Sequence, residues 1–377
     1  MHICRMRIAL VGEYSEVHAN LASGLRGLGH DVVTISGGDG WKGYARDVDL
    51  SRSGKGKLAG LAYAVEAWRK LRDIADYDVV QIINPVFLDL RAERIGQYYR
   101  MLRRRNRKLV LGAYGVDHYY VQACLDGSLK RSDLSYRGKI RQIKEVDLWT
   151  RDWIKGAKGR LNVEVAEDCD AIAAGLPEYY IAYKGVYGKK LSYIALPVRM
   201  EECKVAAEGE ENDCKEDRVR FFVGIQRGKD EFKGTDILLR ALKRLEGEMP
   251  EVVEVRHVVS VPFAEYSKLM DGCDVVLDQL YGYGPAMNGL LAMSKGKVVV
   301  TGLEEETYGM LGEDVLRPLV GVEPEEDAVV EVLRGLAQDR EKVERLGRES
   351  REYAAKHHAM EVVARQYEAL YDRLLRE

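Results

Sequence analysis

The sequence predicts an α/β protein with two doubly wound domains, each a parallel sheet with helices on both faces. Three observations lead to this prediction. The 377 residues are enough for two separate cores at roughly 150 residues per domain. Short apolar runs alternate with helical patterns in both halves of the chain. A polar, strongly acidic stretch at 201–217, EECKVAAEGEENDCKED, separates the halves and is the predicted linker.

In the first half, apolar runs without polar alternation are predicted to be strands buried on both faces, which is typical of parallel sheets. These strands are Arg7–Gly12, Asp31–Ser36, Tyr77–Ile83, Lys108–Ala113, Ala171–Ala174 and Tyr193–Leu196. The segments between them include three predicted helices, at Glu16–Leu28, Leu58–Ile74 and Ile95–Arg105. Residues 1–200 are therefore the predicted N-terminal domain.

The same pattern restarts after the linker and defines a second domain at 218–350. Its predicted strands are Val219–Gly224, Val252–Val259, Asp274–Asp278 and Lys297–Thr301. Its predicted helices are Thr235–Leu245, Ala264–Met270 and one from about Met287, and two or three more follow between Ala328 and Leu375. Ligands of open α/β sheets bind at the carboxyl ends of the strands, so a cleft between the two domains is the expected site.

Composition narrows the class of protein. No apolar stretch approaches the roughly 18–20 residues that cross a bilayer, and the first residues lack the apolar region of a signal peptide. The six cysteines are scattered, without a Cys-x-x-Cys pair, and Cys203 and Cys214 lie in the charged linker. This favours reduced thiols in the cytoplasm over disulfides or a zinc site.

The net charge of −3 conceals an uneven distribution. Residues 1–200 contain 33 Lys and Arg against 23 Asp and Glu, whereas the remaining residues contain 25 against 38. A basic half could face anionic lipid, nucleic acid or a phosphorylated substrate, or be an ordinary solvated surface. Nucleic-acid binding is not predicted, because no recognised motif accompanies the charge.

Gly12 and Glu13 directly follow the first predicted strand, and a helix begins soon after them. A glycine there lets a ligand approach the backbone, and a helix N-terminus favours an anion. The Gly-x-Gly-x-x-Gly fingerprint of dinucleotide sites does not follow this strand, and its one match, at 38–43, is predicted to be a flexible loop. Gly12 and Glu13 are candidate substrate-binding residues, and the alternative is an ordinary strand-to-helix turn.

Asp117 and His118 follow a predicted central strand, where catalytic residues of such sheets usually lie. Neighbouring side chains in an extended segment point opposite ways, so only one of the two is expected to face the cleft. The alternative is a loop pair that bonds to its own backbone.

Gly224, Arg227 and Lys233 surround the loop between the first strand and the first long helix of the second half. Two cations beside the N–H groups of a helix start suit a diphosphate and can stabilise charge on a phosphate leaving group. Isolated basic loop residues are commonly surface charges, but the Lys-Gly-Thr-Asp helix entry favours a site.

The most distinctive segment, DQLYGYGPAMNGLLAMSKGK at 278–297, joins a strand to a helix through a loop rich in Gly and Tyr. The glycines permit close backbone approach or positive φ, and the proline stiffens the helix entry. The candidate substrate-binding residues here are Tyr281, Gly282, Tyr283, Gly284, Pro285, Met287 and Asn288. The alternative is a packed turn in which Asn288 caps the helix.

On these motifs the chain resembles the GT-B glycosyltransferases, and specifically their large retaining group called family 4. Gly224 and Arg227 followed by Lys233-Gly234 are similar to the strand-end Gly-Arg and later Lys-Gly of that family. LAMSKGKVV at 291–299 resembles its Glu-Ala-Met-Ala-x-Gly-Lys-Pro-Val, and YGVD at 114–117 resembles its His-Gly-x-Asp.

The resemblance implies two Rossmann-like domains and a C-terminal helix at 351–377 that packs back on the first domain. It places the nucleotide-sugar donor on the second domain and a glycan or lipid-linked glycan acceptor on the first. It implies retaining transfer in which Arg227 and Lys233 stabilise the departing diphosphate without a divalent metal or other cofactor. Asp117 and His118 would contact the donor sugar or the acceptor hydroxyl. Tyr114 occupies the position of the motif histidine and is a further substrate-binding candidate. The expected role is cell-surface polysaccharide synthesis in the cytoplasm.

Two glutamates of the family motif are absent. Ungapped alignment places Tyr283 and Leu291 at their positions, and we expect Asn288 to take over part of the sugar or ribose contact. The missing carboxylates also motivate a second hypothesis, a non-catalytic subunit that binds a sugar nucleotide or glycan. A nucleotide-sugar epimerase on the same architecture is a third.

Two other charged patterns have alternative explanations. The Asp-x-Asp metal motif of the other glycosyltransferase fold occurs at 47–49, 76–78 and 168–170, all away from the predicted donor pocket, and we interpret these as solvated turns. The run RRRNRK at Arg103–Lys108 could make peripheral contact with an anionic membrane, which would suit a lipid-linked acceptor, or be a solvated helix end.

Overall fold

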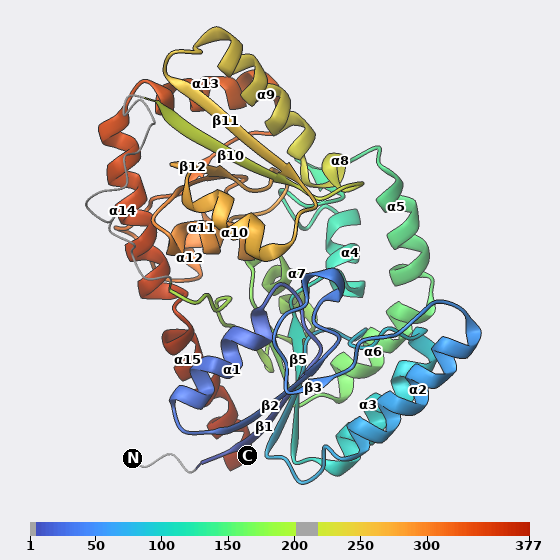
Figure 1. The fold of residues 1–377 in the computed structure, drawn as a ribbon. Helices are drawn as coiled ribbons and strands as arrows, with labels where there is room; N and C mark the ends of the chain where they lie inside the picture. Colours follow the sequence, from blue (N-terminus) through green and yellow to red (C-terminus); the bar gives the residue numbers. More distant parts are fainter. Residues whose placement is uncertain (1–4, 201–217) are drawn as a thin grey trace. The chain divides into compact units, whose positions relative to one another are not determined.

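The computed structural model describes residues 5–200 and 218–377, which form two compact units (Figure 1). The first unit comprises the described residues up to Lys130 together with Arg137–Pro197 and Met360–Glu377. The second comprises Arg131–Tyr136 and the described part of Val198–Ala359. The predicted linker at 201–217, with Cys203 and Cys214, lies outside the described residues. Each unit is described here by itself.

The first unit is built on a seven-stranded sheet in the order β3-β2-β1-β4-β5-β8-β9. All neighbouring strands run parallel, as their apolar sequences predict. The strands are β1 (Arg7–Val11), β2 (Asp31–Ser36), β3 (Val48–Asp49), β4 (Val79–Ile82), β5 (Lys108–Ala113), β8 (Ala171–Ala174) and β9 (Leu191–Tyr193). Because β1 pairs with β2 on one side and β4 on the other, the strand order reverses beside β1.

Helices cover both faces of this sheet. Figure 1 shows α1 and α15 on one side of the strands and α2, α3 and α6 on the other. The helices are α1 (Val17–Gly27), α2 (Lys57–Arg72), α3 (Ala92–Arg105), α4 (His118–Leu125), α5 (Lys144–Trp149), α6 (Ala157–Asp168), α7 (Pro177–Tyr187) and α15 (Met360–Arg376), with short turns of helix at Gly40–Lys42 and Thr150–Ile154 and a short strand β7 (Lys139–Ile140).

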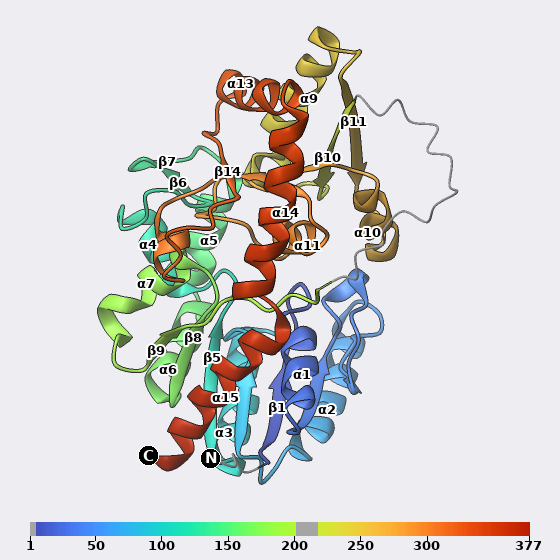
Figure 2. The same cartoon turned by 90° about the vertical axis from the view of Figure 1, so that its left-hand side faces the viewer.

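The C-terminal helix α15 belongs to the first unit and lies along α1 (Figure 2). Its apolar and aromatic stripe, which includes Val363, Tyr367 and Tyr371, is buried. Gly24 of α1 permits this close contact, since a Cβ there would lie 2.4 Å from the carbonyl oxygen of Met360. The C-terminal segment that belongs to the first unit therefore begins at Met360. The sequence predicts that it begins at residue 351.

The second unit has a five-stranded parallel sheet in the order β11-β10-β12-β13-β14. Its strands are β10 (Val219–Ile225), β11 (Val253–Val259), β12 (Val275–Leu277), β13 (Val298–Thr301) and β14 (Val320–Gly321), and the short β6 (Ser135–Tyr136) also belongs to this unit. Its helices are α8 (Asp230–Lys233), α9 (Thr235–Glu248), α10 (Phe263–Asp271), α11 (Met287–Ser294), α12 (Glu306–Gly309), α13 (Glu326–Ala337) and α14 (Arg340–His357).

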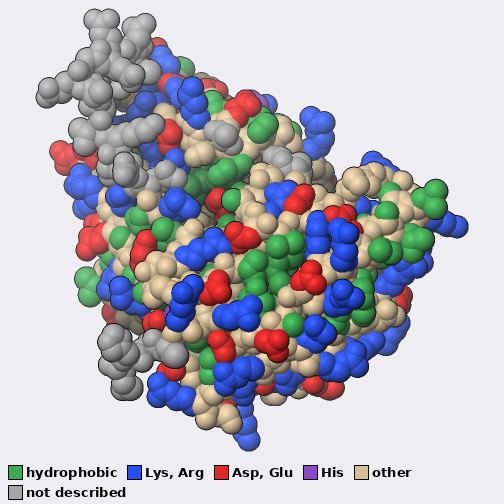
Figure 3. All heavy atoms as spheres, turned by 60° about the horizontal axis from the view of Figure 1, so that its bottom comes forward, with side chains coloured by type: hydrophobic (Ala, Val, Ile, Leu, Met, Phe, Trp, Pro, Cys, Tyr) green, Lys and Arg blue, Asp and Glu red, His purple; other side chains and the backbone are tan. Residues whose placement is uncertain are grey.

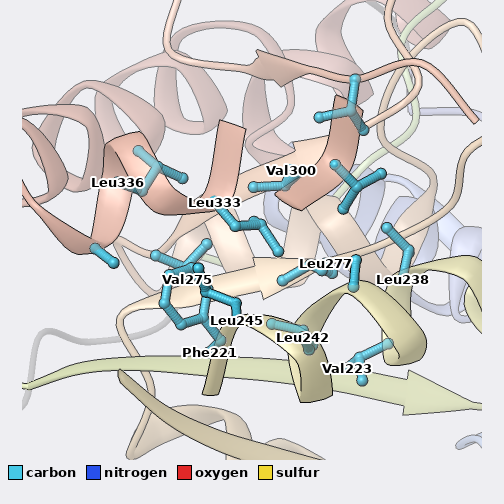
Figure 4. Close-up of a cluster of buried hydrophobic side chains, with 14 of the residues drawn as sticks. Phe221, Val223, Leu238, Leu242, Leu245, Val275, Leu277, Val300, Leu333 and Leu336 are labelled. Atoms are coloured by element: carbon cyan, nitrogen blue, oxygen red, sulfur yellow. The ribbon is translucent and has the colours of Figure 1, made fainter. Parts of the chain in front are cut away.

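The core of the second unit lies between this sheet and the helices α9 and α13. Leucines of both helices, among them Leu242 and Leu333, pack on the strand residues Phe221, Leu277 and Val300 (Figure 4). All five are fully buried. The helical spacing of the leucines and the apolar strands explain why these elements form and how they are held together.

A short segment from the first half of the chain, Arg131–Tyr136, is part of the second unit. The Arg131 side chain is only 2% exposed and donates from Nη1 to the carbonyl oxygens of Leu280 and Val322, at 2.9 Å each. It also pairs with Glu304 at 3.3 Å and Glu323 at 3.1 Å. The sequence predicts one unbroken domain at 1–200. It does not predict that a short segment of this range belongs to the second unit.

One predicted strand is displaced. The sequence predicts a strand at Tyr193–Leu196, but β9 ends at Tyr193. The backbone N–H of Ile194 makes the last bond to the sheet, to the carbonyl of Ala174 at 3.0 Å. Pro197, which follows soon after, has no N–H to donate and cannot continue the strand. The apolar run continues past the strand because 194–196 are buried off its end.

Candidate functional site

In both sheets the strand order reverses beside a central strand, and the loops that leave the carboxyl ends of the strands there are the expected ligand positions. In the second unit β10 pairs with β11 on one side and β12 on the other. The loop after β10 contains Arg227 and leads through α8 to Lys233, and the loop after β12 runs from Asp278 to α11. The residues predicted for the donor site follow these two neighbouring strands.

The loop after β10 combines a close-packed glycine with an exposed arginine. A Cβ on Gly224 would lie 2.4 Å from the ring of Tyr266, so glycine is required for that tyrosine to pack here. The backbone N–H of Arg227 donates to the Ser260 hydroxyl at 3.0 Å, whereas its side chain is exposed. Among the described residues the guanidinium of Arg227 forms no ion pair, which leaves its charge available to a ligand.

Lys233 ends α8 and connects the two loops. Its carbonyl accepts a hydrogen bond from the backbone N–H of Leu280 at 3.0 Å, and Gly234 after it has a φ of 75°. Burial raises the pKa of the Asp278 carboxyl, and the charge of the half-buried Lys233 ammonium opposes this rise, so the two groups lie near one another. In the part of the chain that is described, Lys233 has no ion-pair partner within 4 Å, and the buried Thr235 hydroxyl at the start of α9 has no hydrogen-bond partner.

Asp278 is the buried carboxylate of this site. It accepts hydrogen bonds from the backbone N–H of Ala286 at 3.1 Å and from Nδ2 of Asn288 at 3.2 Å, and burial raises its pKa. Asn288 also bonds to the hydroxyl of Tyr266. The alternative in which Asn288 caps α11 is wrong, because Ala286 occupies the N-cap position and Asp278 satisfies the free N–H groups of the helix.

The Tyr-Gly loop packs into its own unit. Tyr281 and Tyr283 are buried, and neither Gly282 nor Gly284 has positive φ. Gly284 instead allows close approach, since an added Cβ would lie 2.8 Å from Cγ2 of Thr307, whereas at Gly282 the nearest atom, 2.4 Å away, is Nε2 at the flexible end of the Gln279 side chain. Pro285 is buried as well, so Met287 and Asn288 are the predicted residues of this segment that reach the surface.

In the first unit, Gly12 and Glu13 lie at the carboxyl end of β1, beside the reversal of strand order. Gly12 has a φ of 87°, and an added Cβ would lie 2.3 Å from the Ile83 side chain. The Glu13 carboxylate accepts from the backbone N–H groups of His18 at 3.2 Å and Ala19 at 2.9 Å, so it occupies the start of α1 that was expected to favour a ligand anion. Burial raises the pKa of Glu13 to about 7.

Asp117 is fully buried at the N-cap of α4. It accepts from the backbone N–H of Tyr120 at 2.9 Å and from the hydroxyl of Tyr183 at 2.8 Å, and burial raises its pKa to about 7. His118 begins α4, is partly exposed, and places Nδ1 2.8 Å from the carbonyl of Trp153. Their contact with substrate stays a prediction, and for Asp117 it requires movement of the side chains that enclose it.

Tyr114, the counterpart of the motif histidine, takes part in a buried network that holds α15. Its hydroxyl is in close contact with the hydroxyl of Tyr367 and accepts from Nε2 of Gln81 at 3.2 Å. The Tyr371 hydroxyl donates to Oε1 of the same glutamine at 2.8 Å. Tyr114 thus has a structural role in the first unit, and substrate binding by its half-buried ring stays a prediction.

Aspartates of the three Asp-x-Asp motifs form ion pairs and hydrogen bonds within the first unit. Asp47 pairs with Arg26 and accepts from the Thr34 backbone at 2.7 Å, Asp78 pairs with Arg107 at 2.7 Å, and Asp170 pairs with Arg103 at 3.1 Å. Within residues 5–200 and 218–377, no group of three or more His, Cys, Asp or Glu side chains is arranged to hold a metal ion.

Solved structures resemble the whole chain. A sucrose-phosphate synthase from Thermosynechococcus elongatus shares 14% identity, with 98% of this chain and 99% of that one covered and a TM-score of 0.66. Anabaena HepE, solved in complex with UDP-glucose, shares 13% identity over 96% and 98%, with a TM-score of 0.60. WaaG, a glycosyltransferase of lipopolysaccharide biosynthesis, gives the same four values. The chain has the GT-B fold.

The likeness to GT-B proteins extends over the described parts of both units and is a likeness of fold, since the identities are low. No protein-family model matches the sequence, and no curated protein sequence matches it. In the GT-B chain described here, no helix among the described residues is long and apolar enough to cross a membrane. The expected two Rossmann-like domains are confirmed.

Sequence reasoning missed two members of the donor site. Tyr266 packs on Gly224 and bonds to Asn288, but it comes from α10 and carries no motif. Asp278 stands at the end of a predicted strand inside the most distinctive segment, and a strand-end carboxylate before a glycine-rich loop is a signal that could have identified it. Arg227, Lys233 and Asn288, which the sequence predicts, lie on these same loops and on α11 of the second unit.

Proposed function

We propose that the protein is a glycosyltransferase that moves a sugar from a nucleotide-sugar donor to a glycan or lipid-linked glycan acceptor. The observation that carries this proposal is the pair of cations, Arg227 and Lys233, on the loop and short helix that follow the central strand of the second sheet. Neither has an ion-pair partner among the described residues. HepE has been solved with UDP-glucose and starch synthase IV from Arabidopsis thaliana with ADP and acarbose, so relatives in fold bind this class of ligand.

The chemistry needs charge stabilisation at the leaving group. When the bond between the anomeric carbon and the diphosphate oxygen breaks, negative charge develops on the diphosphate, and a fixed guanidinium and ammonium stabilise it. The Thr235 hydroxyl and the N-terminus of α9 lie next to Lys233 in sequence and add donors. The acceptor hydroxyl oxygen bonds to the anomeric carbon with retention of configuration while its proton passes to the departing diphosphate, and the two cations take the place of a divalent metal.

We assign the sugar or ribose contact to Asn288, which bonds to Asp278 and Tyr266 and is half-buried at the start of α11. Asp278 then supplies a buried carboxylate bonded to Asn288. Asp117 and His118 would act on the acceptor side. The setting is the cytoplasm, in cell-surface polysaccharide synthesis, with peripheral contact at the inner face of the membrane where the acceptor is lipid-linked.

A non-catalytic subunit that binds a sugar nucleotide or glycan is the second candidate. It is favoured by one observation: Tyr283 and Leu291, which stand where the family has glutamates, are both buried and lack a carboxylate. In that case the second unit would bind a donor but would not release its diphosphate.

Incubation with a panel of nucleotide sugars and glycan acceptors distinguishes the two. Release of nucleoside diphosphate that depends on both donor and acceptor is expected for the transferase. Calorimetric donor binding without any release supports the non-catalytic subunit. Conversion of the donor sugar without acceptor would instead indicate an epimerase.

A further inference from the structure

The outer face of α2 in the first unit is apolar. Leu58 is 85% exposed, Leu61 55%, Val65 64% and Trp68 41%. Their spacing of three, four and three residues places all four on one side of the helix. We call these four residues the α2 face.

Most of the α2 face is not used in the fold of the first unit: Trp68 packs edge-on against Tyr98 of α3, with ring centroids 5.4 Å apart, whereas Leu58, Leu61 and Val65 are more than half exposed. The opposite side of α2, with Tyr63, Ala64, Ala67 and Leu71, is already buried against the unit. The hydroxyl of Tyr98 in α3 donates to the carbonyl of Ala64 at 2.8 Å and fixes that packing. A surface helix of a globular protein normally turns a polar face to water, so a row of four large apolar side chains on the outer face marks an interaction surface.

Positive charges outnumber negative ones around the α2 face, where Asp73 at the end of the helix is an exposed carboxylate. Lys55 and Lys57 precede the row and Arg69 and Arg72 follow it, all four exposed. The carboxylate within the helix, Glu66, is paired with Lys70. Figure 3 brings one end of the molecule forward and shows Lys and Arg side chains spread over it, with hydrophobic side chains exposed among them.

We propose that the α2 face docks the protein on a lipid bilayer with an anionic surface. An interfacial helix buries its apolar side chains at the level of the acyl chains while its lysines and arginines extend to the headgroup phosphates. Trp68 suits this position, because tryptophan side chains concentrate at the membrane interface. This surface rests on the membrane contact of the proposed function and gives it a location, and vesicle binding tests it separately from sugar transfer.

The structure favours α2 over the arginine run of Arg103–Lys108 as the principal contact. In that run Arg103 pairs with Asp170 at 3.1 Å and Arg107 with Asp78 at 2.7 Å, so part of its charge is neutralised within the unit. The run also lacks exposed large apolar side chains. Because α3 packs beside α2, its exposed cations Arg94 and Arg104 can add electrostatic attraction to a membrane bound at the α2 face.

Vesicle flotation with the full chain tests the proposal. Vesicles of phosphatidylcholine mixed with phosphatidylglycerol are expected to carry the protein to the top of the gradient, and pure phosphatidylcholine vesicles to carry far less. The double variant Leu61→Glu, Val65→Glu should lose at least tenfold in the bound fraction. Val186→Glu, at an apolar position 66% exposed on α7 of the same unit, is the matched control and should bind like the wild type.

Fluorescence gives a second readout, which does not depend on the glutamate variants. Quenching of tryptophan emission by brominated phosphatidylcholine, mixed with phosphatidylglycerol, should occur in the wild type and largely disappear in Trp68→Phe. Absence of flotation on anionic vesicles, or equal flotation of the double variant and Val186→Glu, would overturn the proposal. Light scattering that shows a dimer which the double variant converts to a monomer would also overturn it, since a second copy would then cover the α2 face.

Discussion

Glu13 and Asp117 are carboxyl groups buried at the starts of helices in the first unit. Burial is the largest cause that raises the pKa of each to about 7. In the unfolded chain a carboxyl has a pKa of roughly 4, so between about pH 4 and pH 7 the folded state binds more protons than the unfolded state. Stability contributed by these groups is therefore present at low pH and lost as the pH rises through 7.

Asp117→Asn should remove part of this pH dependence. The amide stays neutral at every pH and keeps an oxygen for the N–H of Tyr120. We expect the free energy of unfolding of the wild type to decrease between pH 5 and pH 7.5. In the variant this decrease should be smaller by up to a few kcal/mol, since one pKa unit corresponds to about 1.4 kcal/mol. Urea titrations at both pH values measure it, with Asp126→Asn, at an exposed position, as the control. Equal pH dependence in the wild type and Asp117→Asn would contradict this.

Asn288 is the residue that we propose contacts the sugar or ribose of the donor in the second unit. Its amide bonds to Asp278 and to Tyr266. Asn288→Ala therefore removes both hydrogen bonds together with the amide that would contact the sugar or ribose. We expect donor affinity to fall about tenfold, corresponding to about 1.4 kcal/mol. Calorimetric titration with the donor identified by the transfer assay measures the change. An unchanged dissociation constant would refute the role of Asn288.

The elements of the fold show which features a sequence can predict. The strands at Asp31–Ser36, Lys108–Ala113 and Ala171–Ala174 agree with prediction residue for residue, because continuous apolar runs in a parallel sheet have few alternatives. The two-residue strands β3 and β14 carry too little pattern to be predicted. At the site, Arg227, Lys233 and Asn288 were predictable from motifs beside strand ends, whereas Tyr266 depends on packing between distant segments.

The segment Arg131–Tyr136 is such a case of distant packing. The buried guanidinium of Arg131 binds two carbonyls and two carboxylates of the second unit, including the carbonyl of Leu280 next to the Tyr-Gly loop. No local pattern distinguishes it from the other arginines of the first half. Its contacts show that the second unit is incomplete without a segment from the first half of the chain.

Arg131→Ala should therefore destabilise the second unit strongly. Removal of one partner from a buried ion pair leaves charges and carbonyls unsatisfied and costs about 3–5 kcal/mol. The urea or thermal unfolding midpoint should fall accordingly, and Arg131→Lys should restore it only in part because lysine lacks the planar guanidinium. Lys139→Ala removes a nearby exposed charge and should change little. A midpoint of Arg131→Ala equal to that of Lys139→Ala would show that the segment is not an integral part of the unit.

At the scale of the whole molecule, two parallel sheets of different size each reverse their strand order beside a central strand. In the first unit the carboxylates of Glu13 and Asp117, which follow β1 and β5, are buried and hydrogen-bonded. In the second unit the side chains of Arg227 and Lys233 have no ion-pair partner within 4 Å among the described residues. The GT-B fold is shared with enzymes that act on sugars, yet fold alone does not fix an activity. In the proposed function, Arg227 and Lys233 of the second unit are the groups that bind the diphosphate of the nucleotide-sugar donor.

The most direct measurement of that connection is calorimetric titration of the full chain with a panel of nucleoside diphosphates. We expect at least one to bind, and Arg227→Ala combined with Lys233→Ala to weaken binding at least a hundredfold. Arg345→Ala, which removes an exposed arginine on α14, should leave binding unchanged. Failure of every nucleoside diphosphate to bind, or binding to the double variant with the affinity of the wild type, would contradict it.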